Sequence, residues 1–123
     1  MSRILIAEDE SRIAAFIEKG LQKNGFDTAI ATNGEEALQM AASNGFDMLL
    51  LDLGLPIKDG WTVLQELRDR GQKIPIIIVS ARDDIEGKRA GLQNGATDYV
   101  TKPFRFQDLL QSVRSHLNNW AVS

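Results

Sequence analysis

The sequence predicts a single α/β domain in which helices cover both faces of a doubly wound parallel sheet. Short apolar runs alternate with stretches of helical periodicity along the chain, which is the pattern of successive βα units. The runs around Met48 and Ile76 are apolar almost without alternation, as expected of strands covered on both faces. The length of 123 residues is close to the commonest domain size, so we expect one domain over residues 1–123.

Five apolar runs are the candidate strands. In chain order they are Ile4–Ala7, Thr28–Ala31, Met48–Leu53, Ile74–Val79 and Tyr99–Thr101. The first, third and fourth runs are the most apolar and therefore belong at the centre of the sheet, whereas the second and fifth are short and belong at its edges. The predicted strand order is 2-1-3-4-5, with the winding reversing between the first and third strands.

Four of the intervening stretches carry apolar residues at helical spacing. Their stripes are Ile13, Phe16, Ile17 and Leu21; Glu36 to Met40; Trp61, Leu64 and Leu67; and Leu109, Leu110, Val113 and Leu117. Glycines at 25, 45 and 71 are candidate helix ends. The stretch between Asp84 and Gly95 contains Gly87 and Gly91, each of which costs about 1 kcal/mol relative to alanine. We expect this fourth of five helices to be the least stable.

Composition excludes several classes of function. A net charge of −3 makes the domain a poor candidate for binding nucleic acid or an anionic membrane. The lack of cysteine excludes disulfides and thiolate chemistry, and one histidine cannot form a His-rich metal site. Any metal must therefore prefer oxygen ligands. With no signal-peptide pattern and no apolar run long enough to span a bilayer, we expect a cytoplasmic protein.

Chemically capable residues follow four of the five predicted strands. Glu8 and Asp9 follow the first, Asp52 ends the third, Ser80 ends the fourth and Lys102 follows the fifth. The carboxyl ends of parallel strands lie at one edge of the sheet, where ligands bind at the reversal point. Three carboxylates repel one another unless a cation lies among them, and Mg²⁺ suits a set of oxygen ligands. A carboxylate nucleophile, a metal and a lysine are what phosphoryl transfer to an aspartate requires.

Each residue taken alone has a simpler interpretation. Acidic residues after a strand are commonly solvated, Asp52 could be a turn residue before Pro56, and Ser80 could cap the next helix. Lys102-Pro103 could be a surface turn. The convergence of all five residues on one end of one sheet favours a phosphoryl-transfer site over these separate explanations.

Several segments together carry a family resemblance. They are Glu8-Asp9, Leu49-Leu50-Leu51-Asp52, Leu53-Gly54-Leu55-Pro56, Asp59-Gly60, Ser80-Ala81 and Asp98-Tyr99-Val100-Thr101-Lys102-Pro103-Phe104. Over essentially its full length the chain resembles the receiver domains of bacterial two-component response regulators. It looks most like those of the winged-helix (OmpR/PhoB-type) transcription-factor branch, which implies a flavodoxin-like fold and a role in transcription regulation.

The resemblance implies a role for each acidic residue. Asp52 would be the phosphoacceptor. Asp9 and Asp52 would bind Mg²⁺ directly, Glu8 would bind it through water, and Gly54 would contribute its backbone carbonyl. The domain would be a signalling switch that assists its own phosphorylation and dephosphorylation, rather than an enzyme.

The resemblance also assigns the residues opposite the acidic group. Ser80 and Lys102 would hold the phosphoryl oxygens, and Ala81 would leave the entrance open. Tyr99 would turn inward when Ser80 moves toward the phosphoryl group. The Lys102–Pro103 peptide bond would be cis.

The implied partner is a sensor histidine kinase or phosphotransfer protein that carries a phosphohistidine. The output would pass through the face made by the fourth helix, fifth strand and fifth helix, to an effector domain in a longer chain or to a separate protein. Our hypothesis is that the glycine-weakened fourth helix is the element that switches. The sequence leaves open whether the receiver stands alone or belongs to a longer regulator.

The same face is where receivers of the winged-helix branch dimerise through ion pairs. Lys88 and Asp108 occupy the positions of one such pair, whereas Ser112 replaces the usual arginine opposite Asp98 and Thr97 replaces an acidic residue. The candidate dimer residues are Lys88, Asp98, Asp108 and Arg114. We expect at most a weak homodimer, because single surface ion pairs contribute little. Phe106 is expected to add apolar contact there, and His116 to be solvated.

Three other classes of protein fit this sequence less well. A flavin-binding flavodoxin-like domain would need a Ser/Thr/Gly-rich phosphate loop after the first strand, where this chain has Glu8, Asp9 and Glu10. A phosphatase that forms an aspartyl-phosphate usually carries Asp-x-Asp, whereas Gly54 follows Asp52 at that spacing. A degenerate receiver acting only as an interaction module would lack the acceptor, the lysine or the acidic pair, and all three are present.

Overall fold

The computed structural model describes residues 2–43, 45–81 and 95–122, with the backbone alone described for 118–122. The strands are β1 (Arg3–Ala7), β2 (Asp27–Ala31), β3 (Met48–Leu51), β4 (Ile76–Ala81) and β5 (Asp98–Lys102). The helices are α1 (Ser11–Lys23), α2 (Gly34–Ala42), α3 (Gly60–Asp69) and α5 (Phe106–Val122). The predicted fourth helix, with Gly87, Lys88 and Gly91, falls outside the described residues. None of the described helices is both long and apolar enough to cross a membrane.

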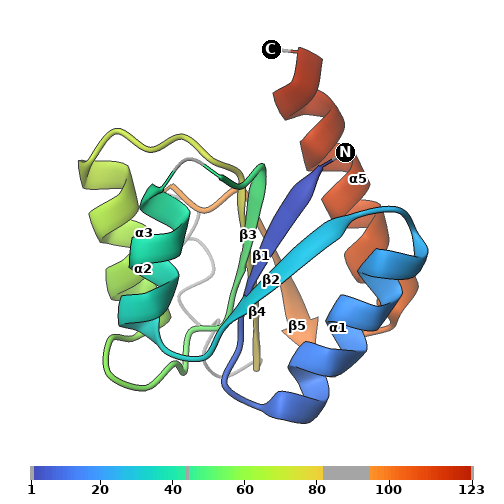
Figure 1. Cartoon of the computed structure of the whole chain (residues 1–123), viewed down its shortest axis with the longest axis horizontal. Coiled ribbons are helices and arrows are strands. Elements are labelled where there is room, and N and C mark those ends of the chain that lie inside the picture. Colours follow the sequence, from blue (N-terminus) through green and yellow to red (C-terminus); the bar gives the residue numbers. More distant parts are fainter. Residues whose placement is uncertain (1, 44, 82–94, 123) are drawn as a thin grey trace.

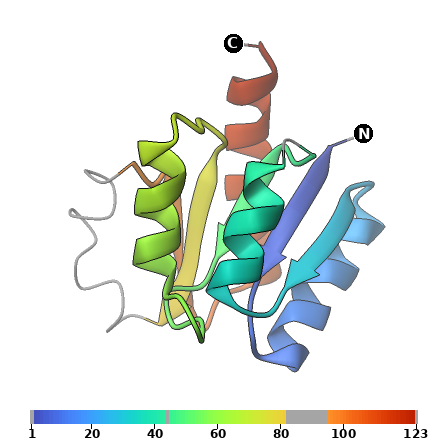
Figure 2. The same cartoon turned by 60° about the vertical axis from the view of Figure 1, so that its left-hand side comes forward.

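The five strands form one parallel sheet in the order β2-β1-β3-β4-β5, which confirms the predicted topology. Helices α2 and α3 cover one face, and α1 and α5 cover the other (Figure 1). The view turned by 60° shows α2 and α3 side by side in front of the sheet (Figure 2). The winding reverses between β1 and β3, so the carboxyl ends of these neighbouring strands border the crevice predicted for the site.

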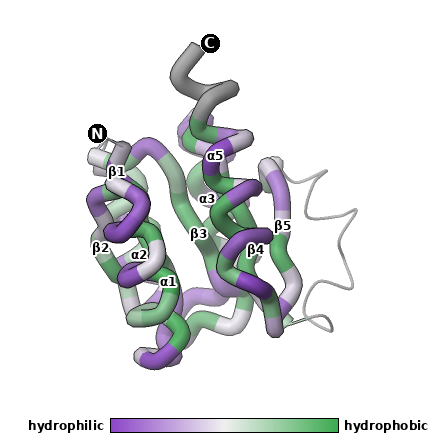
Figure 3. The backbone as a smooth tube through the Cα atoms, turned by 90° about the vertical axis from the view of Figure 1, so that its right-hand side faces the viewer, coloured by the Kyte–Doolittle hydropathy of each residue, from purple (hydrophilic) through white to green (hydrophobic). Residues whose placement is uncertain are grey.

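Each face of the sheet has its own hydrophobic core. The core under α2 and α3 includes Leu5, Leu49, Leu51, Ile76 and Ile78. The core under α1 and α5 includes Ile4, Ile6, Leu50, Ile77 and Val79. Successive apolar residues of β1, β3 and β4 therefore point into opposite cores, which explains why these strands lack an apolar–polar alternation. Green, hydrophobic stretches of the tube lie within the sheet in Figure 3.

Burial outside the strands explains where the predicted boundaries were wrong. β3 ends at Leu51 rather than Leu53, and β4 begins at Ile76 rather than Ile74. Leu53 and Ile74 are nevertheless buried, so an apolar pattern cannot separate them from the strands they flank. Pro75 also lacks the backbone N–H that a ladder position requires.

Helix ends depend on local geometry. Gly25 ends α1 as predicted: its φ is 88°, and the N–H groups of Gly25 and Phe26 donate to the carbonyls of Gln22 and Leu21. The C-cap of α2 is Ser43, not Gly45.

The β3–α3 connection contains a strained three-residue turn. Ile57 has a φ of 71°, and the N–H of Lys58 donates to the carbonyl of Pro56 at 2.8 Å, which defines a γ-turn centred on Ile57. The N–H of Gly34, at the start of α2, donates to the same Pro56 carbonyl at 3.1 Å. A Cβ atom on Gly34 would overlap the Lys58 carbonyl, so α2 packs directly against the turn.

We expect Ile57→Gly to stabilise the domain. A β-branched residue at positive φ costs of order 1–3 kcal/mol, which glycine avoids, although glycine loses about 0.5–1 kcal/mol through greater freedom in the unfolded chain. The net gain in the free energy of unfolding should be about 1 kcal/mol, or about 4 °C in Tm. Thermal unfolding followed by circular dichroism measures it, and a lower Tm for the variant would contradict the strain argument.

Candidate functional site

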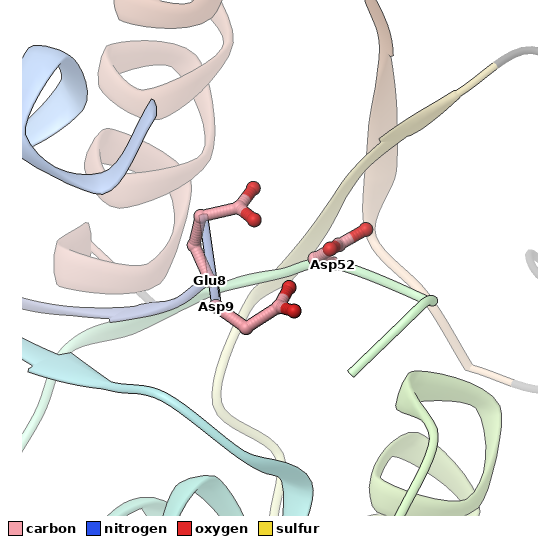
Figure 4. A group of neighbouring side chains, drawn as sticks. All are labelled: Glu8, Asp9 and Asp52. Atoms are coloured by element: carbon pink, nitrogen blue, oxygen red, sulfur yellow. The ribbon is translucent and has the colours of Figure 1, made fainter. Parts of the chain in front are cut away.

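The carboxyl ends of β1 and β3 bring the acidic residues together. The backbone N–H of Glu8 donates to the carbonyl of Ala31, and the N–H of Asp52 donates to the carbonyl of Ala7, both at 3.0 Å. These bonds extend the sheet ladder by one residue beyond each strand. Glu8, Asp9 and Asp52 therefore lie close together at the carboxyl ends of β1 and β3 (Figure 4).

The three carboxylates form one compact group. Each offers an oxygen atom that lies within 4.8 Å of those offered by the other two. Glu8 is only 2% exposed and Asp52 only 8% exposed, whereas Asp9 is open to solvent. Two partly desolvated negative charges beside a third are unfavourable unless positive charge is supplied.

Lys102 supplies part of that charge from the end of β5. Its ammonium group donates to Glu8 Oε1 at 2.6 Å and lies 3.7 Å from Asp52 Oδ2. Burial lowers the pKa of Lys102, but the hydrogen bond to Glu8 and the nearby carboxylates outweigh burial and raise it overall. The lysine is therefore held in its charged form. The following peptide bond, Lys102–Pro103, is cis, as the resemblance implies.

The two carboxylate oxygens of Asp52 lie in different surroundings. The hydroxyl of Ser80, which is fully buried, donates to Asp52 Oδ1 at 2.9 Å. The backbone N–H of Gly54 donates to the same oxygen at 3.3 Å. The carboxylate orientation is thus fixed through Oδ1, and Oδ2 lies on the side of Lys102.

Burial and charged neighbours change the ionisation of Glu8. Burial raises the pKa of the Glu8 carboxyl, and the neighbouring Asp52 raises it further. The hydrogen bonds from Lys102 and from the N–H of Glu10 lower it, but the net direction is upward. Folding of the metal-free domain therefore favours the protonated form of Glu8.

This direction predicts a pH dependence of stability. Because the folded-state pKa is raised, the contribution of Glu8 is fully present below its ordinary pKa of 4.5 and is lost as the pH rises through the raised value. Glu8→Gln cannot ionise, so the stability of the variant relative to wild type should increase as the pH rises above 4.5. Urea unfolding with a chelator present, at several pH values from 4 to 7, measures this difference. If the stability difference between Glu8→Gln and wild type did not change with pH, the upward direction given for the Glu8 pKa would be contradicted.

The oxygen atoms of the acidic group suit a small divalent cation. Mg²⁺ binds oxygen at about 2.1 Å, so opposite ligands of one ion are about 4.2 Å apart. A spread of up to 4.8 Å needs only a small contraction, or a water molecule on one carboxylate. With Lys102 counted, two formal negative charges remain among these four residues, which a divalent ion neutralises.

Of the predicted switch residues, Ser80 lies on β4 and Tyr99 on β5, and the predicted dimer residue Asp98 also lies on β5. Tyr99 is partly buried and packs against the core under α2 and α3. Asp98 accepts a hydrogen bond from Ser112 at 2.7 Å, and His116 Nε2 lies 3.1 Å from the same carboxylate oxygen. The prediction that His116 is solvated is therefore wrong: it is partly buried against Asp98. Thr97 accepts a hydrogen bond from the N–H of Ile76.

Two α5 residues assigned to the dimer face make contacts at α1 and its C-cap instead. Arg114 donates to Asn24 at the end of α1, and it lies about 200° around α5 from Ser112. Phe106 packs edge-on against Phe16 of α1, with ring centroids 6.0 Å apart, instead of extending the face near Asp98. Asp108 is exposed in the first turn of α5, and Lys88 is outside the described residues. Dimerisation through this face stays a prediction.

The direct pair between Lys102 and Glu8 is the site feature that sequence reasoning missed. The sequence predicted that Lys102 would hold a phosphoryl oxygen and that Glu8 would bind the metal through a water molecule. The two residues are 94 positions apart, and no local pattern signals their contact. Only the predicted strand order placed them at the same end of the sheet.

This fold and its acidic pocket define a receiver-type domain, and comparison with known proteins identifies the family. Residues 4–114 match the response regulator receiver domain family. The chain belongs to that family, whose members are signalling domains rather than classical enzymes.

The relatives that the chain resembles include transcriptional regulators. The chain is 38% identical to the transcriptional regulatory protein PcoR of Escherichia coli over 95% of this chain and 52% of that protein. It is 44% identical to the transcriptional regulatory protein YkoG of Bacillus subtilis over 93% of this chain and 50% of that protein. The chain thus spans about half the length of the curated relatives it matches, and it is a receiver domain of the kind found in two-component transcription regulators.

Solved structures of receiver domains have the same fold. The receiver domain of the Francisella response regulator 1452 superposes with a TM-score of 0.91 at 37% identity, covering 97% of this chain and 98% of that one. The response regulator TrrA of Thermotoga maritima, solved in complex with Mg²⁺ and BeF, gives a TM-score of 0.84 at 32% identity, covering 94% and 98%.

Proposed function

We propose that this domain accepts a phosphoryl group on Asp52, in a Mg²⁺-dependent transfer from a phosphohistidine of a sensor histidine kinase or phosphotransfer protein. The observation that carries the proposal is the arrangement around Asp52: two further carboxylates on one side, and a lysine and a buried serine on the other. This combination supplies a nucleophile, a cation site and donors for phosphoryl oxygens.

Asp9 and Asp52 would hold the Mg²⁺ directly, with Glu8 acting through water and Gly54 through its carbonyl. When bound, the ion would neutralise charge on the carboxylates and on the phosphoryl oxygens. The domain in the Thermotoga relative was solved with Mg²⁺ and BeF, which supports this assignment by analogy.

In the proposed transfer, Asp52 Oδ2 attacks phosphorus, since Ser80 and Gly54 hold Oδ1. The new O–P bond forms as the N–P bond to the donor imidazole breaks, and the imidazole nitrogen leaves with the bonding electrons. Lys102, already 3.7 Å from Oδ2, would donate to a phosphoryl oxygen and stabilise its charge.

Phosphorylation would convert the site into a switch. The Ser80 hydroxyl, now on Asp52 Oδ1, would move to a phosphoryl oxygen, and Tyr99 would turn inward behind it. The change would reach the face made by the fourth helix, β5 and α5, where an effector domain or separate partner reads it. Changed output to transcription is the proposed result.

Intact-mass spectrometry tests the proposal. The domain is incubated with acetyl phosphate and Mg²⁺, and in parallel with acetyl phosphate and a chelator. We expect a gain of one phosphoryl group with Mg²⁺ and none with the chelator. No gain in either sample would favour an interaction module without acceptor activity, and equal gains would contradict the role of the metal.

A further inference from the structure

The side chain of Ile57 is exposed to solvent and therefore adds little to the hydrophobic core. Among the described residues, Phe16 and Ile57 are the exposed large hydrophobic side chains. Phe16 contacts the rings of Phe104 and Phe106, whereas Ile57 is 80% exposed. Ile57 also has a φ of 71°, a conformation that favours glycine. Neither burial nor backbone preference therefore explains an isoleucine at this position.

The turn that carries Ile57 is held firmly from three directions. Gly34 of α2 donates to Pro56 on one side of the turn. The ammonium group of Lys58 lies 2.5 Å from Glu66 of α3 and 3.4 Å from Glu35 of α2. The Asp59 carboxylate accepts a hydrogen bond from Thr62 as the N-cap of α3. The isoleucine is thus presented on a fixed support, which reduces the entropy lost on binding a partner.

The same connection borders the acceptor. It leaves β3 at Asp52, passes through Gly54, whose N–H donates to the Asp52 carboxylate, and returns at Gly60. The N–H of Gly60 donates to the carbonyl of Leu53, and a Cβ atom on Gly60 would overlap the Asp52 carbonyl. The loop is therefore closed tightly over the end of β3. A protein that brings a phosphoryl group to Asp52 has to approach within reach of this loop.

We propose that Ile57 is a specificity-determining contact for the protein that donates the phosphoryl group, and that it packs against an apolar side chain beside the donor's phosphohistidine. The proposal rests on the proposed function, because it names the partner of the same site. Backbone strain at a firmly held position, here in the connection that follows Asp52, is concentrated at functional sites. A small-molecule donor offers no such apolar surface and should be indifferent to Ile57.

The test compares a protein donor with a small donor of the same bond type. The protein donor is the autophosphorylated core of a histidine kinase chosen because it phosphorylates the wild-type chain, and the small donor is phosphoramidate, which also carries a P–N bond. The variants are Ile57→Gly, which relieves the strain, and Ile57→Met, which keeps apolar volume. Rates of Asp52 phosphorylation are measured with both donors for the wild type and each variant.

We expect Ile57→Gly to lower kcat/KM for the kinase about tenfold, which is about 1.4 kcal/mol, while the rate with phosphoramidate stays within about twofold of wild type. Ile57→Met should restore most of the kinase rate. Equal kinase rates for Ile57→Gly and wild type would overturn the proposal, as would an equal loss with phosphoramidate or a Met variant as slow as the Gly variant. Phosphorylation of the wild-type chain at a residue other than Asp52 would instead contradict the proposed function.

Discussion

Replacing Asp52 with alanine is expected to abolish phosphorylation of the domain. The 80-dalton gain in mass that we expect for wild type with acetyl phosphate and Mg²⁺, about that of one phosphoryl group, should be absent from Asp52→Ala and from Asp52→Asn. No other carboxylate combines burial with Ser80, Gly54 and Lys102 as partners among the described residues. Loss of the nucleophile should therefore not be compensated.

Asp27→Ala is the matched control for this experiment. Asp27 is an exposed aspartate at the first residue of β2, at the opposite end of the sheet from the site. It should gain one phosphoryl group at the wild-type rate. Both Asp52 variants should retain the wild-type circular dichroism spectrum, because removing one of three clustered carboxylates relieves repulsion. An equal mass gain in Asp52→Ala and wild type would show that another residue is the acceptor.

The sheet was predictable from the sequence because burial on both faces removes alternation from central strands. The runs around Met48 and Ile76 are apolar almost without alternation, and their neighbours in the two cores confirm the reason. Strand ends were less predictable. Leu53 is buried in the turn after β3, and this position is filled by an apolar residue just as a strand position would be. Residue type alone cannot distinguish burial in a turn from burial in a strand.

The site was predictable as a group of residues but not as a set of contacts. Strand order placed Glu8, Asp52 and Lys102 at one edge of the sheet, and the structure brings them together. Which oxygen of Asp52 faces Lys102 depends on rotamers and on a buried serine from another strand. Such contacts are set by packing across the sheet, so they leave no local trace in the sequence.

The surface positions were the least predictable. His116 was expected to be solvated, yet it lies against Asp98 because Ser112 and His116 are four residues apart and share one face of α5. Phe106 packs against α1 because Gly20 has no side chain: a Cβ atom there would overlap the Phe106 ring. A helix stripe shows which residues share a face, but the neighbour of that face comes from the tertiary structure.

Asp9→Asn is expected to remove most of the affinity for Mg²⁺ while leaving the fold intact. Loss of a residue that only supports a metal ligand weakens binding by about 10–100-fold, so loss of a direct ligand should weaken it by at least about 100-fold. At a Mg²⁺ concentration 100 times the wild-type Kd, binding stabilises wild type by about 2.7 kcal/mol. The same concentration should stabilise the variant by only about 0.4 kcal/mol. Urea unfolding with and without Mg²⁺ measures both values.

The stability of Asp9→Asn relative to wild type, measured with a chelator present, distinguishes loss of a metal ligand from damage to the fold. Asp9 is exposed and belongs to a group in which three carboxylates face a single lysine, so the variant should be at least as stable as wild type when a chelator is present. Asp27→Asn removes one negative charge at the far end of the sheet and should keep the full response to Mg²⁺. An Asp9→Asn domain that still gains about 2.7 kcal/mol from Mg²⁺ would mean that the ion binds without Asp9. A variant that is less stable than wild type in the chelator would mean that Asp9 supports the fold itself. Only stability retained without the metal and a response lost with it are consistent with Asp9 as a ligand.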